Sequence, residues 1–156
     1  DMRGLDHGAW VPLMLMYPGA DVPVAQMSIQ TPLGAAHQVA VGRALAPLRD
    51  DGILIIGSGN ITHNLREMHR DAPDGDGHDW VTEFADWVAD ALAAGRIDDL
   101  VAWENNAPHA RRSHPSDEHF LPLFTALGAG GPAAKAQRIH RSFSYGSLAM
   151  DMYLFS

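Results

Sequence analysis

The chain has 156 residues, 46% of them hydrophobic, and a net charge of −8 when its nine histidines are counted as neutral. This length and composition predict one globular domain with a real core, and the acidic balance argues against binding nucleic acid through a general phosphate-binding surface. The longest apolar runs are too short to span a bilayer, and no charged-then-apolar leader opens the chain. We therefore expect a cytoplasmic protein that does not act at a membrane.

Cysteine is absent from the sequence. Disulfides, thiolate nucleophiles and sulfur-ligated metals are thereby excluded. Any metal must be held by nitrogen and oxygen donors, which suits a non-haem iron, zinc or manganese site. The histidines and carboxylates of the chain supply such donors.

The first half of the chain predicts a strand, a helix and a second strand. Residues 20–30 are β-rich, and residues 33–49 have small and apolar residues at helical spacing with basic residues near the end. Residues 53–59, ILIIGSG, form a short run that is apolar on both faces, as expected of a central parallel strand. This order predicts a βαβ unit with a right-handed crossover.

The second half predicts further helices and a β-rich end. Residues 78–95 have an amphipathic helical pattern, and residues 97–105 predict a shorter helix directly after it. Residues 114–131 read as a loop that opens another helix, and residues 138–156 as one or two closing strands with a bend at Gly146.

These elements together predict a single α/β domain over residues 1–156. We expect a mixed, mostly parallel central sheet flanked by helices. The sequence contains no internal repeat and no linker that would divide it.

His63 follows the second predicted strand, within GSGNITHNL. The carboxyl end of a central strand is the usual edge for a site in an open parallel sheet, and Gly57 and Gly59 allow close backbone approach. A dinucleotide fingerprint is a weaker interpretation, because Thr62 stands where the third glycine is needed. From position alone, a strand-end histidine bonded to backbone is a better explanation of His63 than a functional group.

Three other histidines lie in segments marked by glycine or proline. His7 stands between Gly4 and Gly8, and His114 and His119 lie in HPSDEHFLPL. The spacing of His114 and His119 does not place both on one helix face, so we expect one to point at a site and the other to cap or pack. Taken singly, each is explained by a turn or core position. Neutral imidazoles collected in one pocket would suit metal binding or acid–base chemistry.

Five segments taken together resemble the class III extradiol ring-cleaving dioxygenases. They are GLDHGAWVPL, PVAQMSIQ, GSGNITHNLR, HPSDEHFLPLFTALGA and SYGSLAMDMYLF. They run over nearly the whole chain in the order of the family, and the nearest branch is the 4,5-DOPA dioxygenase group, related to the catalytic subunit of protocatechuate 4,5-dioxygenase. This resemblance is more specific than any single motif.

The resemblance implies an α/β enzyme that opens a catechol-type aromatic ring with O2. It implies a non-haem metal, iron(II) for turnover with zinc also possible, which binds both reactants and lowers the pKa of the catechol hydroxyl. It further implies that His119 is a metal ligand and that His63 is either a metal ligand or the catalytic base. For His7 it implies a catalytic role as an acid or as a hydrogen-bonding group facing the substrate.

The resemblance also implies two metal-binding histidines in an N-terminal portion that is not found in this sequence. We therefore expect the domain to be N-terminally incomplete relative to the family, with a complementing chain or a homo-oligomer as possible partners. Two alternatives stay open: a metal-dependent hydrolase on the same scaffold, and a non-catalytic partner subunit that lost the metal.

Overall fold

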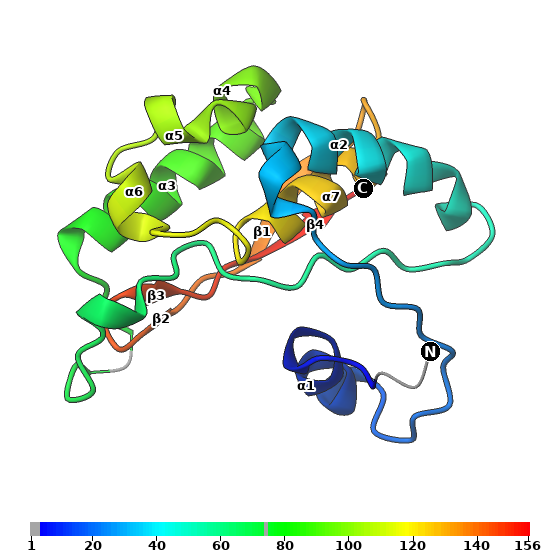
Figure 1. Ribbon diagram of the computed structural model, residues 1–156, viewed down its shortest axis with the longest axis horizontal. Helices are drawn as coiled ribbons and strands as arrows, with labels where there is room; N and C mark the ends of the chain where they lie inside the picture. The colour runs from blue at the N-terminus through cyan, green and yellow to red at the C-terminus, as the bar shows by residue number, and fades with distance from the viewer. Residues whose placement is uncertain (1–3, 74) are drawn as a thin grey trace.

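Helices make up most of the regular structure in the computed structural model, which describes residues 4–73 and 75–156 (Figure 1). The α-helices are α1 (His7–Met16), α2 (Gly34–Leu45), α3 (Asp79–Ala93), α4 (Ile97–Val101), α5 (Trp103–Asn106), α6 (Ala110–Ser113) and α7 (Leu121–Gly130). Short 3-10 turns span Thr31–Leu33, Ala46–Arg49 and Leu65–Glu67. The strands are β1 (Ala136–His140), β2 (Phe143–Ser144), β3 (Leu148–Ala149) and β4 (Met152–Phe155).

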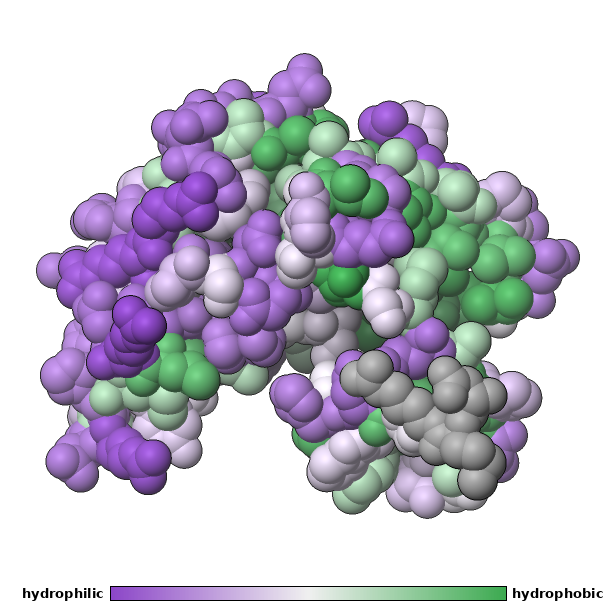
Figure 2. All heavy atoms as spheres, in the orientation of Figure 1, coloured by the Kyte–Doolittle hydropathy of each residue, from purple (hydrophilic) through white to green (hydrophobic). Residues whose placement is uncertain are grey.

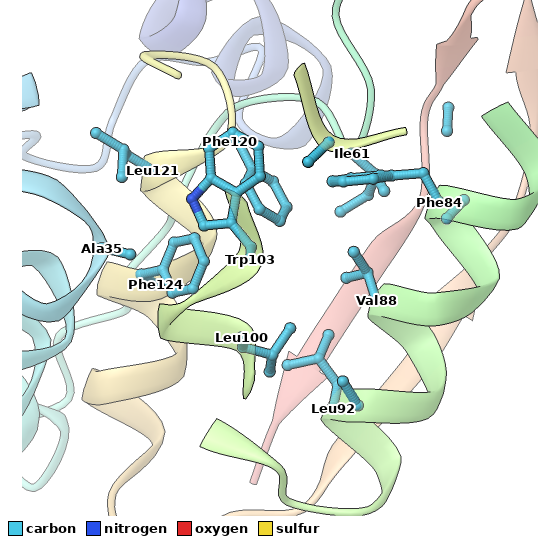
Figure 3. Close-up of a cluster of buried hydrophobic side chains, with 14 of the residues drawn as sticks. Ala35, Ile61, Phe84, Val88, Leu92, Leu100, Trp103, Phe120, Leu121 and Phe124 are labelled. Carbon is cyan, nitrogen blue, oxygen red and sulfur yellow. The ribbon is translucent and has the colours of Figure 1, made fainter. Parts of the chain in front are cut away.

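The amphipathic pattern of residues 78–95 correctly predicts α3. Phe84 and Val88 on its apolar stripe are completely buried, and they face Trp103 and Phe120 in the core (Figure 3). Such aromatic and aliphatic side chains each contribute roughly 1.5–3 kcal/mol when they leave water. The core therefore lies between α3, the α4–α5 segment and the start of α7.

Helices α2 and α7 pack against each other more closely than any other pair. Glycines make this approach possible. A Cβ on Gly42 would lie 2.1 Å from the Thr125 carbonyl oxygen, and one on Gly128 would lie 2.3 Å from the Val39 oxygen. The backbones of the two helices thus touch directly, and this contact fixes α7, which carries the site described below on its N-terminal side.

The expected mixed α/β composition is present, but the described residues form no parallel sheet. Their strands pair antiparallel, β1 with β4 and β2 with β3, and the predicted bend at Gly146 joins β2 to β3 with a φ of +68°. The closing segment therefore holds four strands instead of the one or two that its pattern predicts.

The two segments predicted as strands of the βαβ unit are extended but unpaired. Residues 20–30 and 53–59 have no ladder partner among the described residues. A strand requires a neighbour for its backbone groups, and the apolar pattern that predicts one does not supply it. Ile53 and Leu54 are accordingly exposed, although a central strand would bury them.

Helix α1 was not predicted, and it stands apart from the helical body (Figures 1 and 2). Asp6 caps it by accepting a hydrogen bond from the Ala9 N–H, and Gln26 bonds the same carboxylate. None of its residues is buried, and Pro12 lies inside it. No helix of the described ranges is long and apolar enough to cross a membrane.

We expect Gly42→Ala to destabilise the protein by about 1–3 kcal/mol, because the new methyl group would force α2 and α7 apart. Urea unfolding measures this loss. Gly4→Ala is the matched control, since a Cβ at Gly4 meets nothing within 4 Å. Equal stability of the two variants would contradict the direct backbone contact.

Candidate functional site

The structure brings the imidazoles of His63 and His119 face to face. Their ring centroids lie 3.6 Å apart with an interplanar angle of 16°. His63 follows the extended segment of residues 53–60, and His119 lies in the turn before α7. The structure therefore brings together two of the three histidines predicted as site residues, although the segment before His63 is not the central strand that the sequence predicts.

Backbone hydrogen bonds join the two segments that carry these rings. The Asn60 N–H donates to the His119 oxygen over 2.8 Å, and the His63 N–H donates to the Ser113 oxygen over 2.9 Å. A Cβ on Gly59 would lie 2.1 Å from the His119 oxygen. Gly59 was predicted to allow close backbone approach. In the structure it approaches the backbone just before α7, and not a phosphate group.

Glu118 orients the His119 ring. Its Oε1 lies 3.1 Å from His119 Nδ1 and also accepts a bond from the Ser116 hydroxyl. Partial burial opposes ionisation of Glu118, but its backbone hydrogen bond, Ser116 and His119 together hold its pKa below the usual range. A carboxylate on Nδ1–H leaves the Nε2 lone pair of His119 available, as in many metal-binding histidines. No sequence pattern predicts this bond, because the side chains of adjacent residues usually point in different directions.

The surroundings of His63 favour its neutral form. Burial of its ring, followed by the charge of the neighbouring His119, lowers the pKa of His63 below its ordinary value. Its ring nitrogens have no hydrogen-bond partner in the part of the chain that the structure describes. A neutral imidazole with a free lone pair can accept a proton or bind a metal near neutral pH.

His114 packs into the aromatic core and has no ring contact with the stacked pair. Its ring is fully buried and stacks on Phe120, with centroids 4.8 Å apart. Its Nε2 donates to the Ile61 oxygen over 2.7 Å, whereas its Nδ1 has no partner. Burial lowers the pKa of His114 to about 4, so it is neutral at physiological pH. This agrees with the expectation that one of His114 and His119 points at a site while the other packs.

The structure does not join His7 to the other two histidines. It is the first residue of α1 and is exposed, and no hydrogen bond or ring contact links it to His63 or His119. Its helix nevertheless begins near the site, because a Cβ on Gly8 would lie 3.7 Å from the Ser58 hydroxyl. The assignment of His7 therefore stays a prediction.

The donors that the structure describes do not complete a metal site. No group of three or more histidine, aspartate or glutamate residues within residues 4–73 and 75–156 is arranged to hold a metal ion. His63 and His119 supply two imidazole nitrogens, which are suitable donors for iron or zinc but too few for a stable shell.

A separate hollow near the start of α3 is lined by residues that largely pair with one another. Arg112 Nε donates to Glu67 over 2.9 Å, and His109 Nε2 lies 2.8 Å from Glu83. The full lining is Glu67, His69, His78, Asp79, Trp80, Glu83, His109 and Arg112, without His63 or His119. The stacked pair, which has free ring nitrogens, is therefore the stronger candidate site.

Comparison with known proteins gives the same family as the sequence motifs. Residues 1–155 match the family described as the catalytic LigB subunit of aromatic ring-opening dioxygenase. A protein of Beta vulgaris named 4,5-DOPA dioxygenase extradiol is 46% identical over 155 residues, covering 99% of this chain and 57% of that protein. An Escherichia coli K12 protein of the same name is 40% identical over 131 residues, covering 81% of this chain and 47% of that protein.

The fold has a solved counterpart as well. The crystal structure of an uncharacterized protein from Escherichia coli K12 is similar with a TM-score of 0.85 and 35% identity, covering 98% of this chain and 63% of that chain. The chain thus spans about half the length of the relatives it matches in sequence.

We expect acid to destabilise the fold through His114. Its ordinary pKa is 6.5 and its folded value is about 4. Below pH 6.5 the unfolded chain binds a proton that the folded chain does not, so the free energy of unfolding falls as the pH drops and levels off below about pH 4. The loss approaches about 3 kcal/mol. Urea unfolding at several pH values measures it, and His114→Phe should remove this part of the slope; equal slopes would contradict it.

Proposed function

The chain belongs to the LigB family of aromatic ring-opening dioxygenases, and from this membership we propose that it forms part of an extradiol dioxygenase acting on a catechol-type aromatic. The stacked His63–His119 pair is the observation that carries the proposal, because it brings two imidazole donors from distant segments to one point. The substrate class comes from the names of the relatives, and cleavage uses O2. The protein acts in the cytoplasm in this proposal, without nucleic acid or membrane.

The proposed metal is a non-haem iron(II), with zinc as the second choice. It would bind the catecholate and O2 and lower the pKa of the catechol hydroxyl. His119 would hold it through Nε2, because Glu118 occupies the Nδ1 side of the ring. The remaining donors would come from outside the described residues, since these contain no complete donor group.

His63 has two proposed roles, metal ligand or catalytic base. Its lowered pKa keeps the ring neutral near physiological pH, so its free ring nitrogens are available to accept the proton of the catechol hydroxyl. His7 would act as an acid or as a hydrogen-bonding group on the substrate, brought toward the pair by the α1 N-terminus near Ser58. His7 has no contact with either ring in the structure, so its role depends on a movement of α1 or of the substrate toward it.

We further propose that a complementing polypeptide covers the open face of the domain. We define the open face as α1 together with residues 53–56, where large apolar side chains are exposed, among them Trp10, Leu15 and Leu54. Unpaired extended backbone beside exposed apolar side chains invites strand addition. This chain covers 57% of the Beta vulgaris relative and 47% of the Escherichia coli relative, so each relative contains further chain that could supply such a segment. A homo-oligomer is the alternative occupant.

Anaerobic iron(II) binding and O2 uptake with a simple catechol test the enzyme proposal in the completed protein. His119→Ala should lose both metal binding and turnover, because it removes a proposed ligand. His63→Ala should lower kcat by about 10²–10⁴-fold while metal is retained if His63 is the base, and should lose metal if it is a ligand. His140→Ala, an exposed histidine on β1 bonded to Ser142, is the control.

The remaining outcomes separate the alternatives. Zinc-supported turnover without O2 uptake would favour a hydrolase. A completed fold that neither binds metal nor consumes O2 would show a non-catalytic partner subunit.

We expect the isolated chain to bind iron(II) weakly and to bind a fluorescent apolar dye strongly. Co-expression with the part of the Beta vulgaris relative that lies outside the match should raise metal affinity and reduce dye binding. Leu54→Glu should weaken this complementation because it places a charge on the open face. Ile139→Glu, which adds a charge at an exposed position of β1, should leave it unchanged. Complementation that is insensitive to Leu54→Glu would show that the partner sits elsewhere.

A further inference from the structure

We propose that His114 is a positioning residue that holds His63 in place opposite His119. The inference rests on contacts of His114 that the roles proposed above do not use. His114 is fully buried and its ring donates to the Ile61 backbone oxygen, so its hydrogen-bonded link to the site runs through the backbone.

Two hydrogen bonds form a reciprocal bridge between the segments. The His114 Nε2–H donates to the Ile61 oxygen over 2.7 Å, and the His63 N–H donates to the oxygen of Ser113, the residue before His114, over 2.9 Å. Asn64 extends the bridge by donating from its side chain to the Arg112 oxygen over 2.7 Å. The chain around His63 is thus hydrogen-bonded to the three consecutive residues 112–114. A shift of His63 must break at least one of these bonds.

The surroundings of His114 show that packing alone does not account for a histidine there. Three aromatic rings surround it, with centroids at 4.8 Å for Phe120, 5.6 Å for Phe84 and 5.7 Å for Trp103. Its Nδ1 is buried without a partner, which costs stability. A phenyl ring would fill the same aromatic cage without that cost. What a phenyl ring cannot do is donate to the Ile61 oxygen.

This distinction gives two variants with opposite expectations. His114→Phe keeps the shape and aromatic contacts but loses the donor. His114→Gln keeps an amide N–H at the position of Nε2 but loses the ring. A purely structural role predicts that Phe is the better replacement, whereas the positioning role predicts that Gln is.

Amide hydrogen exchange of the 156-residue chain, followed residue by residue by NMR, tests the inference. In His114→Phe the His63 amide should exchange about tenfold faster or more relative to wild type, while amides in the middle of α3 keep their protection. His114→Gln should keep the protection of the His63 amide within about threefold of wild type. His140→Phe is the surface control and should change neither.

Two results would overturn the inference. One is an unchanged His63 amide in a folded His114→Phe protein, and the other is greater loss of protection in His114→Gln than in His114→Phe. If His114→Phe fails to fold, the Gln variant decides alone: retained protection of His63 supports the inference, and selective loss of it refutes the inference.

A second experiment measures catalysis and rests on the proposed function. In the completed enzyme, His114→Phe should lower kcat about tenfold to a hundredfold with little change in KM, because it misplaces a reacting group without removing a substrate contact; His114→Gln should recover most of this loss. Hydrogen exchange does not depend on activity, so a protein with the expected exchange behaviour and no oxygenase activity would refute the proposed function and leave the positioning role intact.

Discussion

The site depends on hydrogen bonding between residues 59–64 and residues 112–119. In an ordinary sheet a strand that carries a functional residue is held by its neighbours, but here a turn and a short helix provide the partners. The His63 N–H and the Asn60 N–H each find a carbonyl on the opposite segment, so the two rings are brought together by main-chain bonds. Their stacking is therefore a consequence of backbone geometry and does not require a strong attraction between the imidazoles.

Close backbone approach is the condition for those bonds, and glycine supplies it twice. Gly57 meets the Pro122 oxygen and Gly59 meets the His119 oxygen at distances that leave no room for a side chain. The absence of a side chain at Gly42 likewise allows the backbone of α2 to contact α7. The chain of contacts thus runs from the α2–α7 pair through the start of α7 to His119, and it links the rigidity of the site to helix packing some distance away.

The sequence predicts the elements whose own pattern determines them. Helix α3 is one example, because its apolar stripe needs only the core to face. The extended segment of residues 53–60 is the opposite case, since its apolar residues predict a strand whose neighbours are absent from the described chain. Helix α1 was missed because it buries no residue and contains Pro12, so neither periodicity nor propensity favours it.

Some residues of the candidate site could be predicted from the sequence and others could not. Family resemblance selected His63 and His119, and the structure brings them together, although their spacing alone predicts nothing. The orienting bond from Glu118 and the buried donor of His114 were not predictable, because both depend on the turn conformation between α6 and α7. Side chains that act through a neighbour have no sequence pattern of their own.

The segments that carry the stacked pair contact both the buried core and the open face, since His63 bonds Ser113 beside buried His114 and Ser58 lies close to Gly8 of α1. On one side, His114, Phe120 and α3 form a core with completely buried rings. On the other, α1 and residues 53–56 present exposed apolar side chains. The position of the two imidazoles is therefore determined by this chain's own core. In the proposed enzyme, metal affinity and substrate access would be determined by whatever covers the open face. The geometry of the pair and the completeness of the metal shell are thus separable properties, each open to change by substitutions that leave the other intact.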